Sequence, residues 1–206
     1  MNVFQMKTKP HGIQRFKQFI EEGFVCIGWP GIGDLHGIDK DEIKQRLIKR
    51  YGYTGHELGY ALGQVNAFVN TMQDGDIVII KEKGWAYIGI VGEYVYEQQY
   101  DNDQDGMCHR RKVEWKNRIL INELPTSLQK LLNNRNTISQ YPNLLEETEL
   151  DEILGKKQLI KKEEIEMLDN LFTEALAVLE EELKSIDPDR KLKAAIELIR
   201  LKNSKL

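Results

Sequence analysis

The residues in this sequence best suited to hold a ligand are aromatic, and most lie in or beside segments with strand-like alternation. A flat ring system binds well between aromatic faces, and each stack contributes roughly 1–3 kcal/mol for a nucleobase. Core packing is the simpler interpretation for most of these rings. Trp29, in a loop after a strand, and Trp115, at the close of a basic strand, are predicted to face each other across a pocket. The whole set is Trp29, Phe68, Trp85, Tyr87, Tyr94, Tyr96 and Trp115.

Polar side chains near these rings suggest contacts to a base edge and to phosphate. The Asp34 carboxylate can accept from an exocyclic amine, or it can simply bond to the amides of its own turn. The run His109-Arg110-Arg111-Lys112 offers donors to a base or a phosphate, or else protects an exposed strand edge with charge. The predicted base-binding residues are Trp29, Asp34, Tyr94, His109, Arg110 and Trp115, and the predicted phosphate contacts are Arg111 and Lys112.

No catalytic or cofactor motif is recognisable. The nucleophile elbow, the metalloprotease helix motif and the glycine-rich phosphate loops do not occur. Residues 101–106 match the start of an EF-hand loop, but its twelfth position is Lys112, where calcium needs a bidentate Glu. Cys26 and Cys108 lack a Cys-x-x-Cys spacing, which argues against zinc. We expect binding without metal or cofactor; a nuclease with dispersed, unrecognised acidic residues is the alternative.

Composition bounds the class of protein. A chain of 206 residues, 41% hydrophobic, can bury a core. Its first 118 residues carry as many Lys and Arg as Asp and Glu, so the net charge of −4 resides in the remainder. Nucleic acid would therefore have to meet basic residues gathered on one rim. No apolar run is long enough to cross a membrane, and the two cysteines favour a reducing cytoplasm.

Periodicity divides the first 140 residues into helices followed by strands. We predict helices over 13–20, from Asp39 onward, over 58–72 and over 124–132, and strands over 24–27, 77–80, 85–91, 93–100 and 107–115. Asp39 and Glu42 have the spacing of a capping box. Gly89 and Gly92 are expected to mark bulges where the sheet bends. Short, bent strands of this kind suit a small barrel.

The remaining residues have a helical pattern. One apolar stripe runs from Ile165 to Ile186, and Asp187-Pro188 begins a second helix with its own stripe. The two helices are predicted to form a hairpin. Residues 163–201 either pack on the barrel or bind a second copy or another protein.

Several segments, in order, resemble the PUA-like superfamily, nearest its EVE and YTH branch and the barrel modules attached to bacterial modification-dependent restriction nucleases. They are Cys26-Ile27-Gly28-Trp29, Gly33-Asp34-Leu35, 74–80, 88–96 and 109–115. The resemblance implies an α+β fold, a small mixed β-barrel flanked by helices over 1–140, followed by a helical appendage over 141–206.

By resemblance, the barrel would hold one extruded, modified base in an aromatic pocket, on DNA before RNA, in bacterial or phage restriction and defence. No cofactor is implied. The alternative is a protein-interaction module whose C-terminal helices bind the partner while the barrel supports them.

Overall fold

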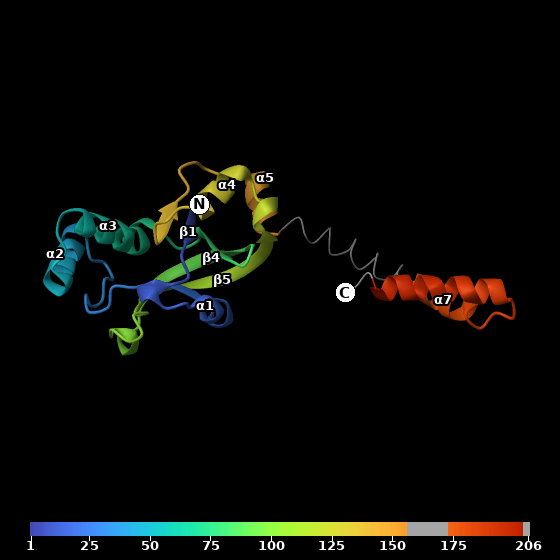
Figure 1. Ribbon diagram of the computed structural model, residues 1–206. Helices are drawn as coiled ribbons and strands as arrows, with labels where there is room; N and C mark the ends of the chain where they lie inside the picture. Colours follow the sequence, from blue (N-terminus) through green and yellow to red (C-terminus); the bar gives the residue numbers. More distant parts are fainter. Residues whose placement is uncertain (156–172, 204–206) are drawn as a thin grey trace. The chain divides into compact units, whose positions relative to one another are not determined.

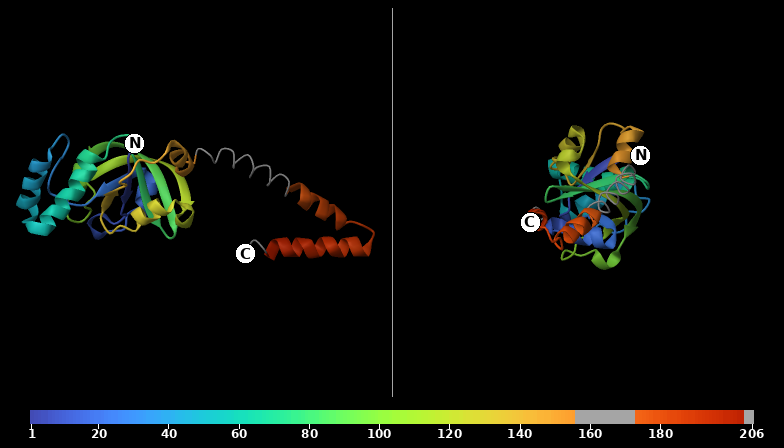
Figure 2. Two further views of the ribbon diagram at one scale, coloured as in Figure 1. Left: turned by 90° about the horizontal axis from the view of Figure 1, so that it is seen from above. Right: turned by 90° about the vertical axis from the view of Figure 1, so that its right-hand side faces the viewer.

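A six-stranded mixed sheet is the framework of the computed structural model, which describes residues 1–155 and 173–203 (Figure 1). The strand order is β2-β5-β4-β3-β1-β6. The strands are β1 (Val3–Met6), β2 (Phe24–Ile27), β3 (Ile77–Glu82), β4 (Trp85–Tyr96), β5 (His109–Leu120) and β6 (Ile138–Gln140). They curl around a common interior as a half-barrel (Figure 2). The predicted α+β class is confirmed.

Helices pack on both faces of this sheet. The longer ones are α1 (Phe16–Glu22), α2 (Lys40–Tyr51), α3 (Gly55–Asn66), α4 (Thr126–Leu132) and α5 (Glu147–Ile153). Shorter helical turns are η1 (Pro10–Gly12), η2 (Ala67–Thr71), η3 (Gln98–Tyr100) and η4 (Ile121–Glu123). The predicted cap of α2 is present, because the Asp39 carboxylate accepts from the Glu42 amide at 2.9 Å.

The sheet separates two hydrophobic cores, which explains why β3 reads as a continuous apolar run. Val78 and Ile80 pack with α1, α2 and α3, whereas Ile77 and Ile79 pack with α4 and α5. Successive side chains on a strand point to opposite faces, so a strand covered on both faces needs apolar residues throughout.

The sheet bends within β4, as the glycines predicted. The pairing of β4 with β5 shifts register between Ile88 and Gly89 and again between Val91 and Tyr94. A Cβ on Gly89 would lie 2.3 Å from Cγ1 of Val113, so only glycine permits this close approach. The second shift places a bulge at Gly92 as predicted, but the predicted division into two strands there is wrong, because β4 continues to Tyr96 before η3 begins.

Two strands, β1 and β6, were not predicted from the sequence. β1 pairs in parallel with β3 and antiparallel with β6, so β6 belongs to the main sheet. Tyr141 and Ile153 are buried in the core beneath α4 and α5. The first compact unit is Met1–Gly155 and so extends past the predicted barrel of residues 1–140.

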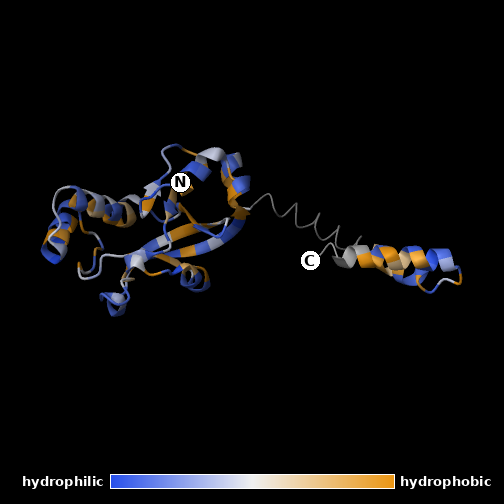
Figure 3. Ribbon diagram, viewed as in Figure 1, coloured by the Kyte–Doolittle hydropathy of each residue, from blue (hydrophilic) through white to orange (hydrophobic). Residues whose placement is uncertain are grey.

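The second unit, Lys156–Leu206, is described in part. Residues 173–182 are helical, residues 183–187 connect, and α7 (Pro188–Asn203) follows. The stripe from Ile165 to Phe172 lies outside the described residues. Hydrophobic residues recur along the described helices (Figure 3), and Val178, Leu192 and Ile199 are each at least 60% exposed. No described helix has the length and apolar character needed to cross a membrane.

Candidate functional site

Three strand ends meet at one end of the sheet. The pairing of β2 with β5 places Ile27 opposite His109, and the pairing of β4 with β5 places Tyr96 opposite the same histidine. The loop after β2 (residues 28–37) and the connection between β4 and β5 (residues 97–108) therefore emerge side by side. The residues that these two loops carry are far apart in sequence and close in space.

An aromatic pocket lies beside this strand end. Its volume is about 290 Å³, and three aromatic side chains, all half-buried, line it. The lining residues are Lys9, Pro10, His11, Gly12, Gly28, Trp29, Tyr51, Tyr53 and Thr137. The rings of Tyr51 and Tyr53 are stacked, with centroids 4.9 Å apart and planes 9° apart. The pocket (hereafter the aromatic pocket) thus combines η1, the loop after β2 and the end of α2.

Two residues of the aromatic pocket hold unusual backbone conformations. Trp29 has φ of 69° and His11 has φ of 50°, in the left-handed region that side chains disfavour. Lys83, in a hairpin turn, is the other non-glycine residue with positive φ in the described part of the chain. A Cβ on Gly28 would lie 2.9 Å from the His11 amide nitrogen, so the two strained segments touch. Strain of this kind clusters at ligand sites, where surrounding contacts fix it.

Hydrogen bonds fix the loop that carries Trp29. The Tyr51 hydroxyl donates to the Pro30 carbonyl at 2.6 Å, and the Gly31 amide donates to the Asp101 carboxylate. Farther along, the Leu35 amide donates to the Tyr94 hydroxyl at 3.3 Å. The loop is therefore tied to α2, to the 97–108 connection and to β4, which holds the indole of Trp29 in a defined place.

A buried polar cluster stands behind this loop. The Tyr94 hydroxyl lies 2.8 Å from His109 Nδ1. Because that hydroxyl accepts from the Leu35 amide, we assign it as the donor to an unprotonated Nδ1, so the neutral imidazole carries its own proton on Nε2. His109 is fully buried, and its Nε2 has no hydrogen-bond partner among the described residues. Burial lowers the pKa of His109 to about 4, against the opposing pull of the Asp101 charge and the Trp29 carbonyl. The imidazole is neutral at pH 7.

Asp101 is the charged member of the cluster. Its carboxylate accepts from the Tyr96 hydroxyl, the Gly31 amide and the Cys108 thiol. Burial raises its pKa, but these three hydrogen bonds outweigh burial and the net effect is a lowered pKa. Asp101 is therefore an anion that organises the loops.

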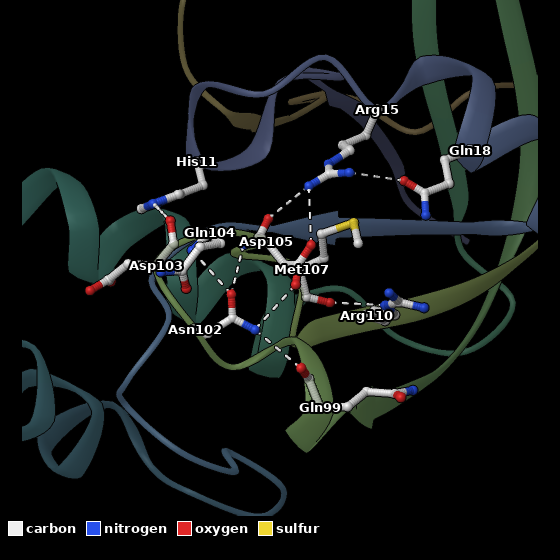
Figure 4. Close-up of polar contacts among 10 residues, drawn as sticks. All are labelled: His11, Arg15, Gln18, Gln99, Asn102, Asp103, Gln104, Asp105, Met107 and Arg110. Carbon is white, nitrogen blue, oxygen red and sulfur yellow. Dashed lines mark hydrogen bonds and ion pairs between the residues drawn. The ribbon is translucent and has the colours of Figure 1, made fainter.

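The loop of residues 101–106 packs against His11 (Figure 4). His11 Nε2 donates to the Asp103 carbonyl at 2.9 Å, and a Cβ on Gly106 would lie 2.5 Å from the Cβ of His11. Asn102 Oδ1 accepts from the amides of residues 104 and 105, which makes a side-chain-bonded turn. The aspartates of this loop bond in different directions, with Asp103 on Arg50, and so do not converge. No cluster of three metal-ligating side chains occurs within 1–155 and 173–203.

The structure brings together some of the predicted site residues. Trp29, Tyr94 and His109 meet at the strand end, although the last two lie behind the aromatic pocket and not in its lining. Asp34 is exposed, and its carboxylate accepts from the His36 amide at 2.9 Å, which is the turn role. Lys112 is exposed on β5 and stays a predicted phosphate contact.

Three other predicted residues lie elsewhere. Arg111 is buried, and its guanidinium donates to the carbonyls of residues 68, 69, 72 and 92, so its prediction as a phosphate contact is wrong. Arg110 lies between the rings of Phe24 and Tyr100, 4.3 and 4.1 Å from their centroids, and does not line the pocket.

Trp115 does not face Trp29. It lies six residues beyond His109 on β5, about 20 Å along a strand. Trp29 instead follows the end of β2 that pairs with His109, so it lies beside the start of β5. Its Nε1 donates to the Phe19 carbonyl at 2.8 Å. The prediction that Trp115 completes the pocket is wrong, because antiparallel pairing separates the two indoles.

One family model matches residues 5–141 of this chain, described as a domain of unknown function, DUF8426. The chain belongs to this family. No curated protein and no solved structure matches it. The DUF8426 region contains every lining residue of the aromatic pocket, from Lys9 to Thr137, and five of the six strands in full.

Sequence reasoning missed His11, Tyr51 and Tyr53 as members of the aromatic pocket. Tyr51 falls on the buried stripe of α2, where a core role was the simpler interpretation. The residues around the glycine after α2 gave one usable signal, since Tyr51-Gly52-Tyr53 places two aromatic rings around a helix stop. His11 gave none, because β1 and η1 were not predicted.

Proposed function

We propose that this protein binds nucleic acid and holds one extruded base, modified in its specific target, in the aromatic pocket, on a half-barrel of the PUA-like, EVE/YTH-like kind. The carrying observation is the pocket of about 290 Å³ lined by Trp29, Tyr51 and Tyr53 at a strand end. That volume lies just below the usual range for ligand pockets, roughly 300–1,000 Å³, and suits a single flat ring better than a large cofactor.

The chemistry of the aromatic pocket favours a base over an aliphatic ligand. Aromatic faces stack with any base, and that stacking offsets the few kcal/mol that extrusion costs. Polar groups at the rim, the Lys9 ammonium and the Thr137 hydroxyl, can reach a base edge or its sugar. The fixed backbone at Trp29 means that little ordering remains to be done on binding.

The preference for DNA and a role in restriction or phage defence rest on the family resemblance given above. Base binding without catalysis is the activity that we assign. The test for catalysis is direct: labelled oligonucleotides incubated with the protein and Mg²⁺ should be recovered intact. Metal-dependent cleavage would favour the nuclease alternative.

The decisive experiment measures binding to matched oligonucleotides with and without modified cytosine or adenine, at 100 mM salt, by fluorescence anisotropy. Trp29→Ala should weaken binding by roughly 1–3 kcal/mol and reduce discrimination between the two oligonucleotides. Trp85→Ala is the matched control, since Trp85 begins β4 and its ring contacts Arg118 away from the pocket. Equal losses in both variants would contradict the assignment of the pocket.

A second role is favoured for residues 163–201, of which 163–172 lie outside the described residues. Val178, Leu192 and Ile199 are apolar and largely exposed. We propose that this segment, as a helical hairpin, binds a second copy or a partner protein. Sedimentation of the full chain and of a chain ending at Gly155 tests this role, because loss of self-association in the shorter chain is expected for a dimer.

A further inference from the structure

A second cleft adjoins the aromatic pocket on the same loop. It has a volume of about 520 Å³ and lies between the glycine-rich residues 31–33 and one stripe of α2. Arg46, Lys49 and Arg50 line it together with a single carboxylate, Glu42. We call it the basic cleft. The function proposed above does not use it.

Two arginines of the basic cleft are already held in place, Arg46 by the loop after β2 and Arg50 by the 97–108 connection. Arg46 Nη1 donates to the carbonyls of Ile32 and Asp34, at 3.2 and 2.6 Å, while its Nε bonds to Glu42. Arg50 Nη2 donates to both carboxylate oxygens of Asp103, at 2.8 and 2.9 Å. Their guanidinium groups are thereby positioned before any ligand arrives, which lowers the entropic cost of binding.

Glycine allows this close packing. A Cβ on Gly31 would lie 2.2 Å from the Arg50 Nε, and the φ of Gly31 is 83°. The loop can therefore run directly over the guanidinium. Any other residue there would force the Arg50 side chain to shift.

The charged side chains around the basic cleft give it a net positive charge. Glu42 offsets Arg46 and Asp103 offsets Arg50, whereas Lys49 is exposed and has no ion pair within the described part of the chain. A net charge near +1 with several N–H donors suits one phosphodiester group. Lys49 and Arg50 also occupy the last turn of α2, where cations stabilise the helix dipole, and this purely structural role is the alternative.

We infer that the basic cleft binds a backbone phosphate of the same strand whose extruded base enters the aromatic pocket. This inference rests on the function proposed above. Tyr51 lines the aromatic pocket and Arg50, the preceding residue, lines the basic cleft, so both sites open on either side of Pro30-Gly31. The hydrogen bond from Tyr51 to the Pro30 carbonyl fixes their separation. A base and a neighbouring phosphate on one nucleic-acid strand are likewise adjacent, so one strand can occupy both sites.

The test measures the salt dependence of oligonucleotide binding by the full chain, between 50 and 200 mM NaCl. With duplex oligonucleotides, Lys49→Gln should lower the slope of log K against log salt by about 0.9, the value for one phosphate of B-form DNA, so the fall in affinity over that range becomes roughly 3.5-fold smaller. The loss should be equal for modified and unmodified oligonucleotides. Lys44→Gln, also exposed on α2 but outside the cleft, is the matched control and should keep the parent slope.

A second measurement separates this inference from the base-binding proposal. Pyrophosphate titrated into the ¹⁵N-labelled protein should shift the amide resonances of Gly31 and Gly33, and should not do so in Lys49→Gln. An unchanged slope in Lys49→Gln, with base discrimination intact, overturns the basic cleft and leaves the aromatic pocket. If pyrophosphate shifts both glycines but no oligonucleotide binds, the strand assignment is overturned together with the proposed function.

Discussion

Replacement of His109 by Asn should remove a pH dependence from folding stability. In the folded protein, burial lowers the pKa of His109 to about 4 from the usual 6.5. As pH falls below 6.5, the unfolded chain takes up a proton at this residue that the folded chain refuses until about pH 4. The stabilising contribution of neutral His109 is therefore complete above pH 6.5 and is lost as pH falls toward 4.

The size of the effect follows from that difference in pKa. Two and a half units correspond to about 3 kcal/mol over the whole range, and about 2 kcal/mol should already be lost at pH 5. Groups around His109 leave this window clear: Tyr94 and Cys108 have raised pKa values from burial, and Asp101, on balance, has a lowered one. Titration of Asp101 affects stability only at lower pH.

The assay is urea unfolding at pH 7, 6, 5 and 4.5, followed by far-ultraviolet circular dichroism. The Asn side chain can bond to Tyr94 but does not titrate, so His109→Asn is less stable at pH 7 because it leaves a cavity. The difference in unfolding free energy between parent and variant should shrink by about 2 kcal/mol from pH 7 to pH 5. His56→Asn, at an exposed position of α3, is the control and should retain the parent pH slope. A constant parent–variant difference for His109→Asn would refute the buried, neutral imidazole.

Three further changes test the packing that supports the site. Arg111→Met should lower the free energy of unfolding by at least about 3 kcal/mol in urea titrations, because four carbonyl acceptors lose their donor. Lys112→Met, exposed on the same strand, is the control and should change that free energy by under about 0.5 kcal/mol. Gly106→Ala should lower the melting temperature by several degrees, about 1–3 kcal/mol, through overlap with His11 and a positive φ of 58°; no change would mean that the loop moves freely. A chain ending at Gly155 should keep the parent's cooperative thermal transition, since it contains both described cores of the first unit; loss of cooperativity would contradict the division into two units.

Local signals in the sequence were sufficient for much of the fold. The stop of α1 at Gly23, the cap of α2 at Asp39 and the bends of β4 depend on residues within a few positions of each other. β1 (Val3–Met6) was missed, and its strand character comes from pairing with the distant strands β3 and β6. The boundary at 155 depends on burial of Tyr141 and Ile153, which no local pattern reveals.

Residues of the candidate site could be predicted only where the neighbouring sequence itself marked the position as unusual. Trp29 could be found because its Gly-Trp-Pro-Gly loop is an unusual place for an indole. In the structure, the positive φ of Trp29 shows that this position is indeed unusual. Arg111 and Lys112 could not be told apart as phosphate contacts, since neighbours on a strand point to opposite faces and the sequence did not show which face the carbonyls of η2 would occupy. The same alternation buries His109 and Arg111 and leaves Lys112 exposed.

Alternate residues of the basic run on β5 therefore point to opposite faces, and a group of three cations beside the aromatic pocket comes from α2 instead. Charge clustered in sequence was the signal used to predict phosphate contacts, but charge clustered in space is what a phosphate meets. Arg46, Lys49 and Arg50 follow helical spacing and so form one stripe, a pattern that is visible in the sequence and equally typical of a solvated helix face. What distinguishes the two interpretations is the glycine-rich loop opposite, which only the fold brings to α2.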